Sequence, residues 1–251
     1  MMPLSYQLDP PTHTRIGLIV LQADETIEDD MRRLLPASAS CLVSRVPSDL
    51  EVTSDTLREM ENHLTAAAAL FPHSAEFAAI GYGCTSGTAE IGAEQVARLV
   101  RAGAKTNEVS EPLTALIAAC RHLSIGRLGL VSPYVAPVSD RLRQALGAAG
   151  IETPLFESFE EPLEAHVARI DEPSIISAAV TMGLNTACDA VFLSCTNLKT
   201  LSAIPRIEAE IGKPVLSSNQ VLGWHLCRIA GLPLPQDFPG LLASGTRENR
   251  N

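Results

Sequence analysis

Arg15-Ile16-Gly17-Leu18-Ile19-Val20 is the segment that decides the fold, because its pattern returns 112 residues later as Arg127-Leu128-Gly129-Leu130-Val131-Ser132. Two more pairs recur at offsets of 111 and 107: Gly83-Cys84-Thr85-Ser86 with Ser194-Cys195-Thr196-Asn197, and Ser110-Glu111-Pro112 with Ser217-Ser218-Asn219. Three landmarks in the same order at nearly constant spacing predict two halves of like topology. The boundary between them is expected near residues 105–126.

Short apolar runs alternate with longer segments of helical period along the whole chain. The expected strands are 16–21, 41–46, 77–81, 128–131, 191–194 and 214–216. The expected helices are 25–35, 54–71, 89–102, 112–122, 139–149, 172–187, 200–211 and 220–230. Strand and helix alternating in this way predict the α/β class, with parallel sheets covered by helices on both faces.

The duplicated pattern also suggests how the chain divides. One lobe is expected to contain residues 15–110 together with 217–232, and a second lobe residues 111–216. Residues 1–14 are expected to form a flexible N-terminus, and residues 233–251 a C-terminal tail.

The composition excludes several classes of protein. Of 251 residues, 46% are hydrophobic and 19% are charged, which favours a folded core over disorder. The formal net charge of −10 disfavours nucleic acid and anionic membranes as partners. No apolar run approaches the roughly 20 residues of a membrane span, and residues 1–15 lack the features of a signal peptide. A cytoplasmic location is therefore expected.

Six cysteines are scattered without a C-x-x-C pair, which predicts free thiols rather than a disulfide scaffold. Cys84 and Cys195 each follow an expected strand and precede polar residues. Ligands of parallel α/β sheets bind beyond the carboxyl ends of the strands, so both thiols are expected to face one cleft between the lobes. The other four have apolar neighbours and are interpreted as core residues: Cys41, Cys120, Cys188 and Cys227.

Two opposed thiols can invert a carbon next to a carboxylate. One thiolate removes a proton from one face while the other thiol delivers a proton to the opposite face. Backbone N–H groups and hydroxyls at Thr85, Ser86, Thr196 and Asn197 could hold the carboxylate and stabilise the charge that develops on it. This chemistry requires no cofactor, and the histidines show no metal-ligand spacing.

The cysteine motifs resemble those of the Asp/Glu racemase superfamily. They are Gly81-Tyr82-Gly83-Cys84-Thr85-Ser86-Gly87-Thr88, Ser194-Cys195-Thr196-Asn197-Leu198, Ser132-Pro133-Tyr134, and Ser217-Ser218-Asn219-Gln220 followed by Trp224-His225. The most similar branch contains maleate cis-trans isomerases, arylmalonate decarboxylases and racemase-like proteins of ectoine degradation. The resemblance implies two Rossmann-like, pseudo-symmetric lobes with the active site between them. It also implies that Cys84 and Cys195 are catalytic and that Tyr134 binds a substrate carboxylate.

Cysteine content separates the reactions within this superfamily. Arylmalonate decarboxylases keep only the second cysteine, so the presence of Cys84 disfavours a pure decarboxylase. Maleate isomerases and racemases keep both. In the former, the first thiolate adds to the double bond and the second thiol supplies a proton. The thiol count therefore leaves these two reactions open.

Asp24 bears on the choice between them. Maleate isomerases resemble this chain but carry asparagine at this position, and another asparagine near the position of Glu164. An ionised Asp24 would repel a maleate dianion but would favour a substrate ammonium group. Asp24 is also a candidate N-cap of helix 25–35, with Glu28 near the capping-box position. The acidic residues of the later run are interpreted as a solvated face or loop lip: Glu157, Glu160, Glu161 and Glu164.

The sequence therefore predicts a cofactor-independent two-cysteine isomerase or racemase that acts on a small carboxylate. An amino acid or acylated amino acid is the first choice of substrate, and maleate cis-trans isomerisation is the alternative. An arylmalonate-type decarboxylase and a non-catalytic carboxylate-binding protein remain as further alternatives. A homo-oligomer is compatible with such lobes, although no interface is visible in the sequence.

Overall fold

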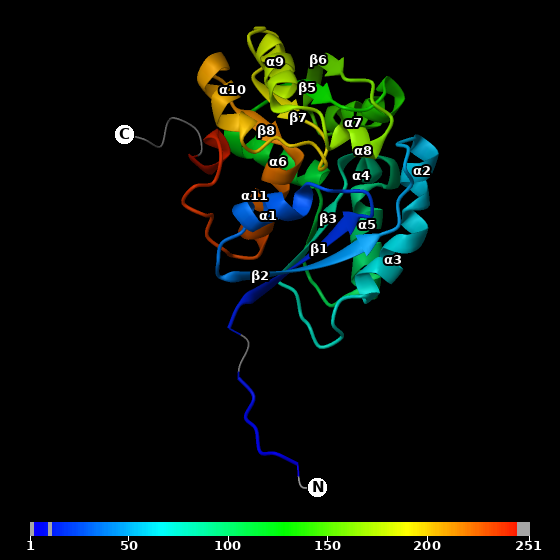
Figure 1. Ribbon diagram of the computed structural model, residues 1–251. Helices are drawn as coiled ribbons and strands as arrows, with labels where there is room; N and C mark the ends of the chain where they lie inside the picture. Colours follow the sequence, from blue (N-terminus) through cyan, green and yellow to red (C-terminus); the bar gives the residue numbers. More distant parts are fainter. Residues whose placement is uncertain (1–2, 10–11, 245–251) are drawn as a thin grey trace.

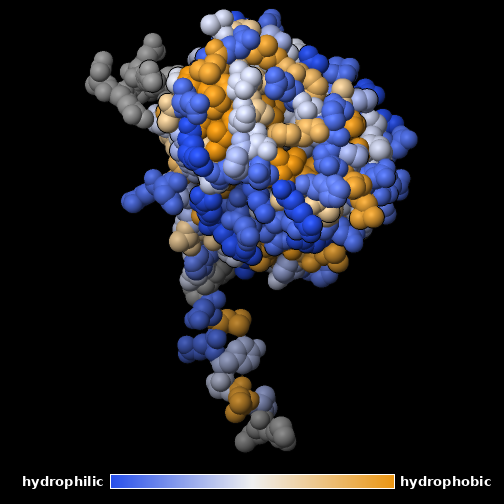
Figure 2. Space-filling view, turned by 45° about the horizontal axis from the view of Figure 1, so that its top comes forward, coloured by the Kyte–Doolittle hydropathy of each residue, from blue (hydrophilic) through white to orange (hydrophobic). Residues whose placement is uncertain are grey.

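The computed structural model describes residues 3–9 and 12–244, and Figure 1 shows how their elements are arranged. Residues 1–2, 10–11 and 245–251 lie outside the described residues, so parts of the predicted N-terminus and C-terminal tail are not tested. Residues 3–9 are exposed and extend away from the body of the molecule (Figure 1 and Figure 2). Thr14, predicted to belong to the flexible N-terminus, is instead the first residue of a strand.

The first half of the chain forms a parallel sheet with the strand order β2-β1-β3-β4. Its strands are β1 (Thr14–Leu21), β2 (Ala39–Val46), β3 (Ala79–Gly83) and β4 (Val109–Ser110). Its helices are α1 (Ile27–Leu34), α2 (Ser54–Glu59), α3 (Glu61–Ala69), α4 (Thr85–Ile91) and α5 (Ala93–Gly103). The central strands β1 and β3 are almost wholly buried, which explains why they consist of continuous apolar residues rather than an alternating pattern.

The second half forms a parallel sheet with the corresponding order β6-β5-β7-β8. Its strands are β5 (Arg127–Ser132), β6 (Glu152–Ser158), β7 (Ala190–Leu193) and β8 (Val215–Ser217). The remaining helices are α6 (Pro112–Leu123), α7 (Ala136–Ala148), α8 (Glu164–Val167), α9 (Glu172–Gly183), α10 (Ala203–Ile211), α11 (Ser218–Ile229) and the 3-10 helix η1 (Leu241–Ser244). The predicted α/β class and the duplicated topology are confirmed, since β1 corresponds to β5 and β3 to β7.

The two halves are joined by packing as well as by the chain. Helix α11 follows β8 of the second sheet but packs against α1, α6 and β3. Glu51 and Leu163 form an antiparallel bridge between the halves, and Val52 N donates to Pro162 O at 3.0 Å. The residue boundaries predicted for the lobes stay a prediction.

Several predicted elements differ from the structure for identifiable reasons. The expected helix 54–71 is divided at Met60, and the expected helix 89–102 begins at Thr85 and is interrupted at Gly92, where φ is +94°. Strand β6 was not predicted because it is a half-exposed edge strand that contains charged residues and a proline. The two-residue strand β4 and the one-turn helix α8 are too short to show a period.

Cys41 corrects the interpretation of the cysteines as core residues. Cys41 is exposed, whereas Cys120, Cys188 and Cys227 are buried as expected. The reason is that β2 is an edge strand of its sheet, so its side chains are covered less completely than those of β1. In the predicted C-terminal tail, Phe238 and Leu242 are buried, and Leu241 N donates to the carboxylate of Glu208.

Within the part of the chain that the structure describes, no helix is both long enough and apolar enough to cross a bilayer.

Candidate active site

Cys84 lies between the end of β3 and the start of α4. It is the N-cap of α4, with an extended backbone (φ −151°), and its Sγ accepts a hydrogen bond from Gly87 N at 3.1 Å. Thr88 Oγ1 donates to Cys84 O at 2.6 Å, which fixes the turn. Glycine is needed at position 87, because a Cβ there would lie 2.8 Å from Cys84 Sγ and 2.9 Å from the hydroxyl of Tyr82.

Cys195 occupies the equivalent position at the end of β7, but no regular helix follows it directly. Its φ is +107°, a strained conformation that costs an L-residue about 1–3 kcal/mol and that persists only where surrounding contacts enforce it. Those contacts come from the loop that follows it and from the start of α11. Cys195 N donates to Ser218 Oγ at 2.9 Å, and its Sγ accepts from Asn197 N at 3.2 Å.

Both thiols line one small cavity between the two sheets. Its volume is about 10 Å³, which corresponds to room for a single water molecule. The cavity is lined by Leu21, Asp24, Leu57, Cys84, Thr85, Ser86, Tyr134, Glu164, Cys195 and Thr196. The structure thus brings together seven of the eight predicted site residues, with Asn197 as the exception.

Asn197 ties neighbouring segments together instead of lining the cavity. Its Oδ1 accepts from Glu25 N at 2.8 Å, and its Nδ2 lies within hydrogen-bond distance of Ala23 O, Glu164 O and Glu164 Oε2. These contacts involve both the oxygen and the nitrogen of the Asn197 amide. The side chain therefore positions the residues around the cavity, in contrast to the carboxylate-binding role predicted for it.

Tyr134 connects Cys195 to a carboxyl group. Its hydroxyl lies 2.8 Å from Glu164 Oε1 and 2.9 Å from Cys195 Sγ, and the whole side chain is buried. The backbone turn after β5 is held by Ser132 Oγ, which accepts from Tyr134 N at 3.2 Å.

Glu164 is the site residue that the sequence interpretation missed. It was expected on a solvated acidic face, but only 5% of it is exposed and its carboxyl group lines the cavity. It begins helix α8, and Glu164 N donates to Leu50 O of the first half at 3.3 Å. The other members of the acidic run, Glu157, Glu160 and Glu161, are not buried. Because Glu164 belongs to the same run, the sequence pattern assigned it the same exposed environment. The one signal in the sequence was its alignment with an asparagine of maleate isomerases.

Asp24 serves a backbone turn and the cavity at the same time. Its Oδ1 accepts from Thr26 N and Ile27 N at 2.8 Å each, while Oδ2 is buried without a hydrogen-bond partner among the described residues. The expected capping box with Glu28 is absent, because Thr26 and not Asp24 is the N-cap residue of α1. Glu28 pairs with Arg45, whose guanidinium also donates to Asp24 O. Asp24 therefore accepts from backbone N–H groups at the start of α1 with one oxygen and presents the other to the cavity.

The site disfavours negative charge. Burial raises the pKa of both Asp24 and Glu164 above their ordinary values. Burial also raises the pKa of Cys84 to about 12 and raises the pKa of Cys195 well above its ordinary value. No lysine, arginine or histidine is among the described residues that line the cavity. A thiolate in this closed cavity therefore depends on hydrogen bonds or on a substrate for its stabilisation.

A metal-based site has no support in the side chains. Among the described residues, no group of three or more His, Cys, Asp or Glu side chains is arranged to hold a metal ion.

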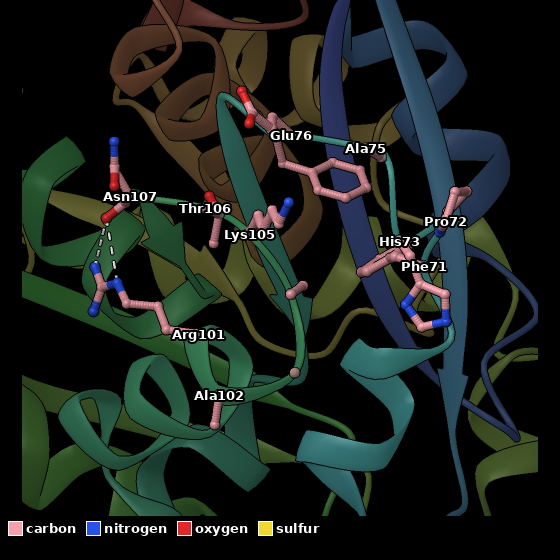
Figure 3. Close-up of a pocket in the computed structure, with 13 residues that line it drawn as sticks. Phe71, Pro72, His73, Ala75, Glu76, Arg101, Ala102, Lys105, Thr106 and Asn107 are labelled. Carbon is pink, nitrogen blue, oxygen red and sulfur yellow. Dashed lines mark hydrogen bonds between the residues drawn. The ribbon is translucent and has the colours of Figure 1, made fainter.

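A much larger hollow of about 640 Å³ lies away from the thiols (Figure 3). It lies near the amino end of β3 and is lined by residues 71–77 and 101–107. Arg101, one of its lining residues, donates to the backbone oxygen of Asn107. Because ligands of parallel sheets bind at the carboxyl ends of the strands, we assign the chemistry to the small cavity.

Comparisons with known proteins agree with this geometry. A family model described as arylmalonate decarboxylase matches residues 109–242. The chain is 24% identical to a maleate isomerase of Geobacillus stearothermophilus (93% of this chain, 98% of the relative). It is 28% identical to an arylmalonate decarboxylase of Bordetella bronchiseptica (90% and 92%).

A solved structure has the same fold as this chain. It is a cysteine variant of Nocardia farcinica maleate cis-trans isomerase with a covalently bound succinylcysteine intermediate. Its TM-score is 0.78 at 24% identity, covering 92% of this chain and 98% of that chain. The family model spans more than half of the 251 residues. This chain therefore belongs to the arylmalonate decarboxylase family, in the branch of the Asp/Glu racemase superfamily that its cysteine motifs predicted.

Proposed function

We propose that this chain is an isomerase that acts on a small carboxylic acid through Cys84 and Cys195, without a cofactor. The observation that carries the proposal is that both thiols line one buried cavity, each at the carboxyl end of a corresponding strand. The predicted class, an isomerase, is also that of the maleate isomerase relatives.

The surroundings of the two thiols support different roles. The Gly87 N–H group and the Tyr82 hydroxyl both lower the pKa of Cys84 against the effect of burial. We therefore assign Cys84 as the thiolate that attacks the substrate. Burial and the nearby Glu164 carboxyl group raise the pKa of Cys195, and Tyr134 connects its sulfur to that carboxyl group, so Cys195 is assigned as the acid.

Cis-trans isomerisation of a cis-dicarboxylic acid is the first candidate reaction, because the relatives named maleate isomerase match over most of the chain. The Cys84 thiolate adds to one alkene carbon, and the displaced electron pair passes to the adjacent carbon and its carboxylate. Cys195 then protonates that carbon, which leaves a single bond about which the adduct rotates. Removal of the proton by Cys195 and departure of Cys84 restore the double bond in the trans form.

Racemisation of an amino acid, which the sequence favoured, is the second candidate. The specific observation in its favour is Asp24 Oδ2, which is buried at the cavity and lacks a partner in the described part of the structure. A substrate ammonium group would supply that partner and a compensating charge. For a dicarboxylate, by contrast, Asp24 would have to be protonated and donate a hydrogen bond. The raised pKa of Asp24 makes this protonation easier.

Either substrate requires the cavity to open, since its present volume admits only a water molecule. The contacts between the halves at Val52–Pro162 and Leu50–Glu164 lie at or next to Glu164, which lines the cavity. We expect these contacts to separate when substrate enters.

The test is to incubate the enzyme in deuterated water with maleate, and separately with amino acids and N-acyl amino acids, and to follow ¹H NMR. Formation of fumarate identifies the first candidate, and exchange of the Cα proton identifies the second. Cys84→Ser and Cys195→Ser are the controls, and activity that survives both substitutions would overturn the proposal. Thermal stabilisation by a carboxylate without turnover would instead indicate a binding protein, and loss of carbon dioxide from an arylmalonate would indicate a decarboxylase.

A further inference from the structure

Glu164, Tyr134 and Cys195 form a chain of hydrogen bonds at the cavity. The Tyr134 hydroxyl oxygen lies 2.8 Å from Glu164 Oε1 and 2.9 Å from Cys195 Sγ. All three side chains are buried, with exposed fractions of 5%, 5% and 3%. The hydroxyl carries one proton, so it can donate to only one of these two neighbours at a time.

The other carboxyl oxygen of Glu164 determines where an acid proton would sit. Asn197 Nδ2 donates to Glu164 Oε2 at 3.0 Å and lies 3.2 Å from Glu164 O. The orientation of this amide is fixed because its Oδ1 accepts from Glu25 N at 2.8 Å. Since Oε2 is already an acceptor, a proton on Glu164 belongs on Oε1, the oxygen that faces Tyr134.

Two arrangements satisfy every contact in the chain when it carries one negative charge. In the first, Glu164 is ionised, Tyr134 donates to it, and the Cys195 thiol donates to Tyr134. In the second, Glu164 is protonated and donates to Tyr134, which donates to a Cys195 thiolate. The two arrangements differ only by the shift of one proton along each of the two hydrogen bonds.

We propose that Glu164 is a positioning residue that acts as a proton reservoir behind Cys195, with Tyr134 as the relay. This role deepens the proposed function and rests on it for its place in turnover. When Cys195 gives its proton to the substrate carbon, Tyr134 transfers its own proton to Cys195 Sγ. Glu164 Oε1 replaces the proton of Tyr134, and the negative charge ends on Glu164. When Cys195 removes the proton again after rotation, the same two shifts run in reverse and return a proton to Glu164.

The charged groups around Cys195 are compatible with this relay. Tyr134, Glu164, Asp24 and Cys84 are the titratable groups that line the cavity with it, and no basic side chain lines the cavity within the described ranges. Burial raises the pKa of Glu164, so a protonated reservoir persists to higher pH than for an exposed glutamate. Asp24 is also a buried carboxyl group near Cys195, but it has no hydrogen bond to Tyr134 among the described contacts. Asp24 thus provides a matched control.

The test is a double-mutant cycle on the thiol, which needs no substrate. In a Cys84→Ser background, the pH dependence of Cys195 modification by methyl methanethiosulfonate is measured by peptide mass spectrometry. Glu164→Gln is expected to lower the midpoint by more than about one pH unit, because a Cys195 thiolate then no longer competes with a carboxylate for the Tyr134 proton. In the presence of Tyr134→Phe the same substitution is expected to shift the midpoint by less than half as much. Asp24→Asn is expected to give the same shift in both backgrounds.

Equal shifts from Glu164→Gln with and without the tyrosine hydroxyl would overturn the relay and leave only a through-space effect. If Glu164→Gln does not fold, Glu164→Asp replaces it, because the shorter side chain moves the carboxyl group away from Tyr134. Equal shifts from Glu164→Asp with and without the tyrosine hydroxyl would likewise overturn the relay. During turnover, Glu164→Gln is expected to lower kcat about 10- to 100-fold with little change in KM and to remove the fall of kcat at high pH. A lack of turnover with every substrate, together with an intact coupling in the thiol assay, would contradict the proposed function but not the relay.

Discussion

The ends of β3 and β7 are equivalent in the duplicated fold, yet they present their cysteines in different ways. Cys84 caps a helix in an unstrained conformation, and Gly87 N donates to its sulfur. Cys195 has φ +107° and is held by side chains from other segments, including Ser218 and Tyr134. The same topology therefore gives each sulfur one backbone N–H donor, from Gly87 for Cys84 and from Asn197 for Cys195, but among the described contacts only Cys195 is linked through a buried hydroxyl to a carboxyl group.

This difference indicates how a symmetric scaffold produces an asymmetric reaction. A backbone N–H donor can stabilise either sulfur as a thiolate, the form that attacks or removes a proton, so the difference lies in the link from Cys195 to Tyr134 and Glu164. A tyrosine linked to a glutamate can return a proton, which is what the acid requires. The following predictions test this contrast between the Cys84 side and the Cys195 side, beginning with the largest expected effect.

Replacing either cysteine is expected to abolish turnover, by a factor of at least about 10³, but with different products. Cys195→Ser retains the attacking thiol, so it is expected to accumulate a covalent adduct at Cys84 when an unsaturated dicarboxylate is supplied. Cys84→Ser is expected to form none. Intact-protein mass spectrometry detects the adduct, and an adduct located on Cys195 would reverse the assigned roles.

The two tyrosines next to the thiols are expected to differ in importance. Tyr134→Phe removes the hydroxyl shared by Cys195 and Glu164, and we expect kcat to fall about 10²-fold or more. Tyr82→Phe removes a hydroxyl that donates to Met60 Sδ at 3.7 Å, and we expect a fall of about 10-fold or less. Steady-state kinetics of both variants checks this order, and a larger effect of Tyr82→Phe would contradict the division of roles.

Gly87→Ala is expected to disturb the Cys84 side selectively. The new Cβ would meet Cys84 Sγ, Met60 Cε and the Tyr82 hydroxyl within 2.9 Å, and we expect a cost of about 1–3 kcal/mol in the free energy of unfolding. Gly147→Ala is the control, because no atom lies within 4 Å of a Cβ there, and a gain of up to about 1 kcal/mol is expected. Urea denaturation compares the two, and equal effects would mean that the Cys84 turn is loosely packed.

Asp30 offers a pH-dependent test of the Cys195 side. Asn219 Nδ2 donates to Asp30 Oδ2 at 2.8 Å and lies 2.7 Å from Thr196 O, so this pair supports the loop that carries Cys195. Burial raises the pKa of Asp30 from 3.8 to about 6. The folded protein therefore binds this proton more tightly than the unfolded chain, and stability falls as the pH rises from about 4 through about 6.

Asp30→Asn is expected to remove that decline, which amounts to about 2 kcal/mol between pH 4 and pH 7.5. Asp29→Asn, at the exposed neighbouring position, is the control and is expected to retain the decline. Urea denaturation at several pH values provides the measurement. The same pH dependence in both variants would show that Asp30 does not titrate in this range.

The sequence was most informative where residues repeat or where burial is continuous. The apolar runs of β1, β3, β5 and β7 predicted the centres of both sheets, and the repeated cysteine motif predicted which thiols meet. Strand β6 and Cys41 were not predicted correctly, because edge strands are only half-covered and their composition resembles that of loops.

The candidate site was less predictable from the sequence where it depends on segments distant along the chain. Glu164 is buried because Leu50, Tyr134 and Asn197 surround it, and none of these is its neighbour in the sequence. Asn197 was expected in the cavity, but contacts with residues 23–25 draw its side chain away. A motif identifies which residue types are present, whereas the tertiary fold decides which of them face the cavity.

The most direct test of the account is the stoichiometry of thiol modification at the cavity. In a Cys41→Ser chain, which lacks the exposed cysteine, iodoacetamide is expected to modify Cys84 or Cys195 but not both in the same molecule. The reason is that, once the cavity has opened to admit the reagent, the first carbamidomethyl group occupies the space that the two sulfur atoms share. Intact-protein mass spectrometry should show a single addition. Molecules that carry the modification on both thiols, formed at independent rates, would contradict the claim that the two sulfur atoms share one site.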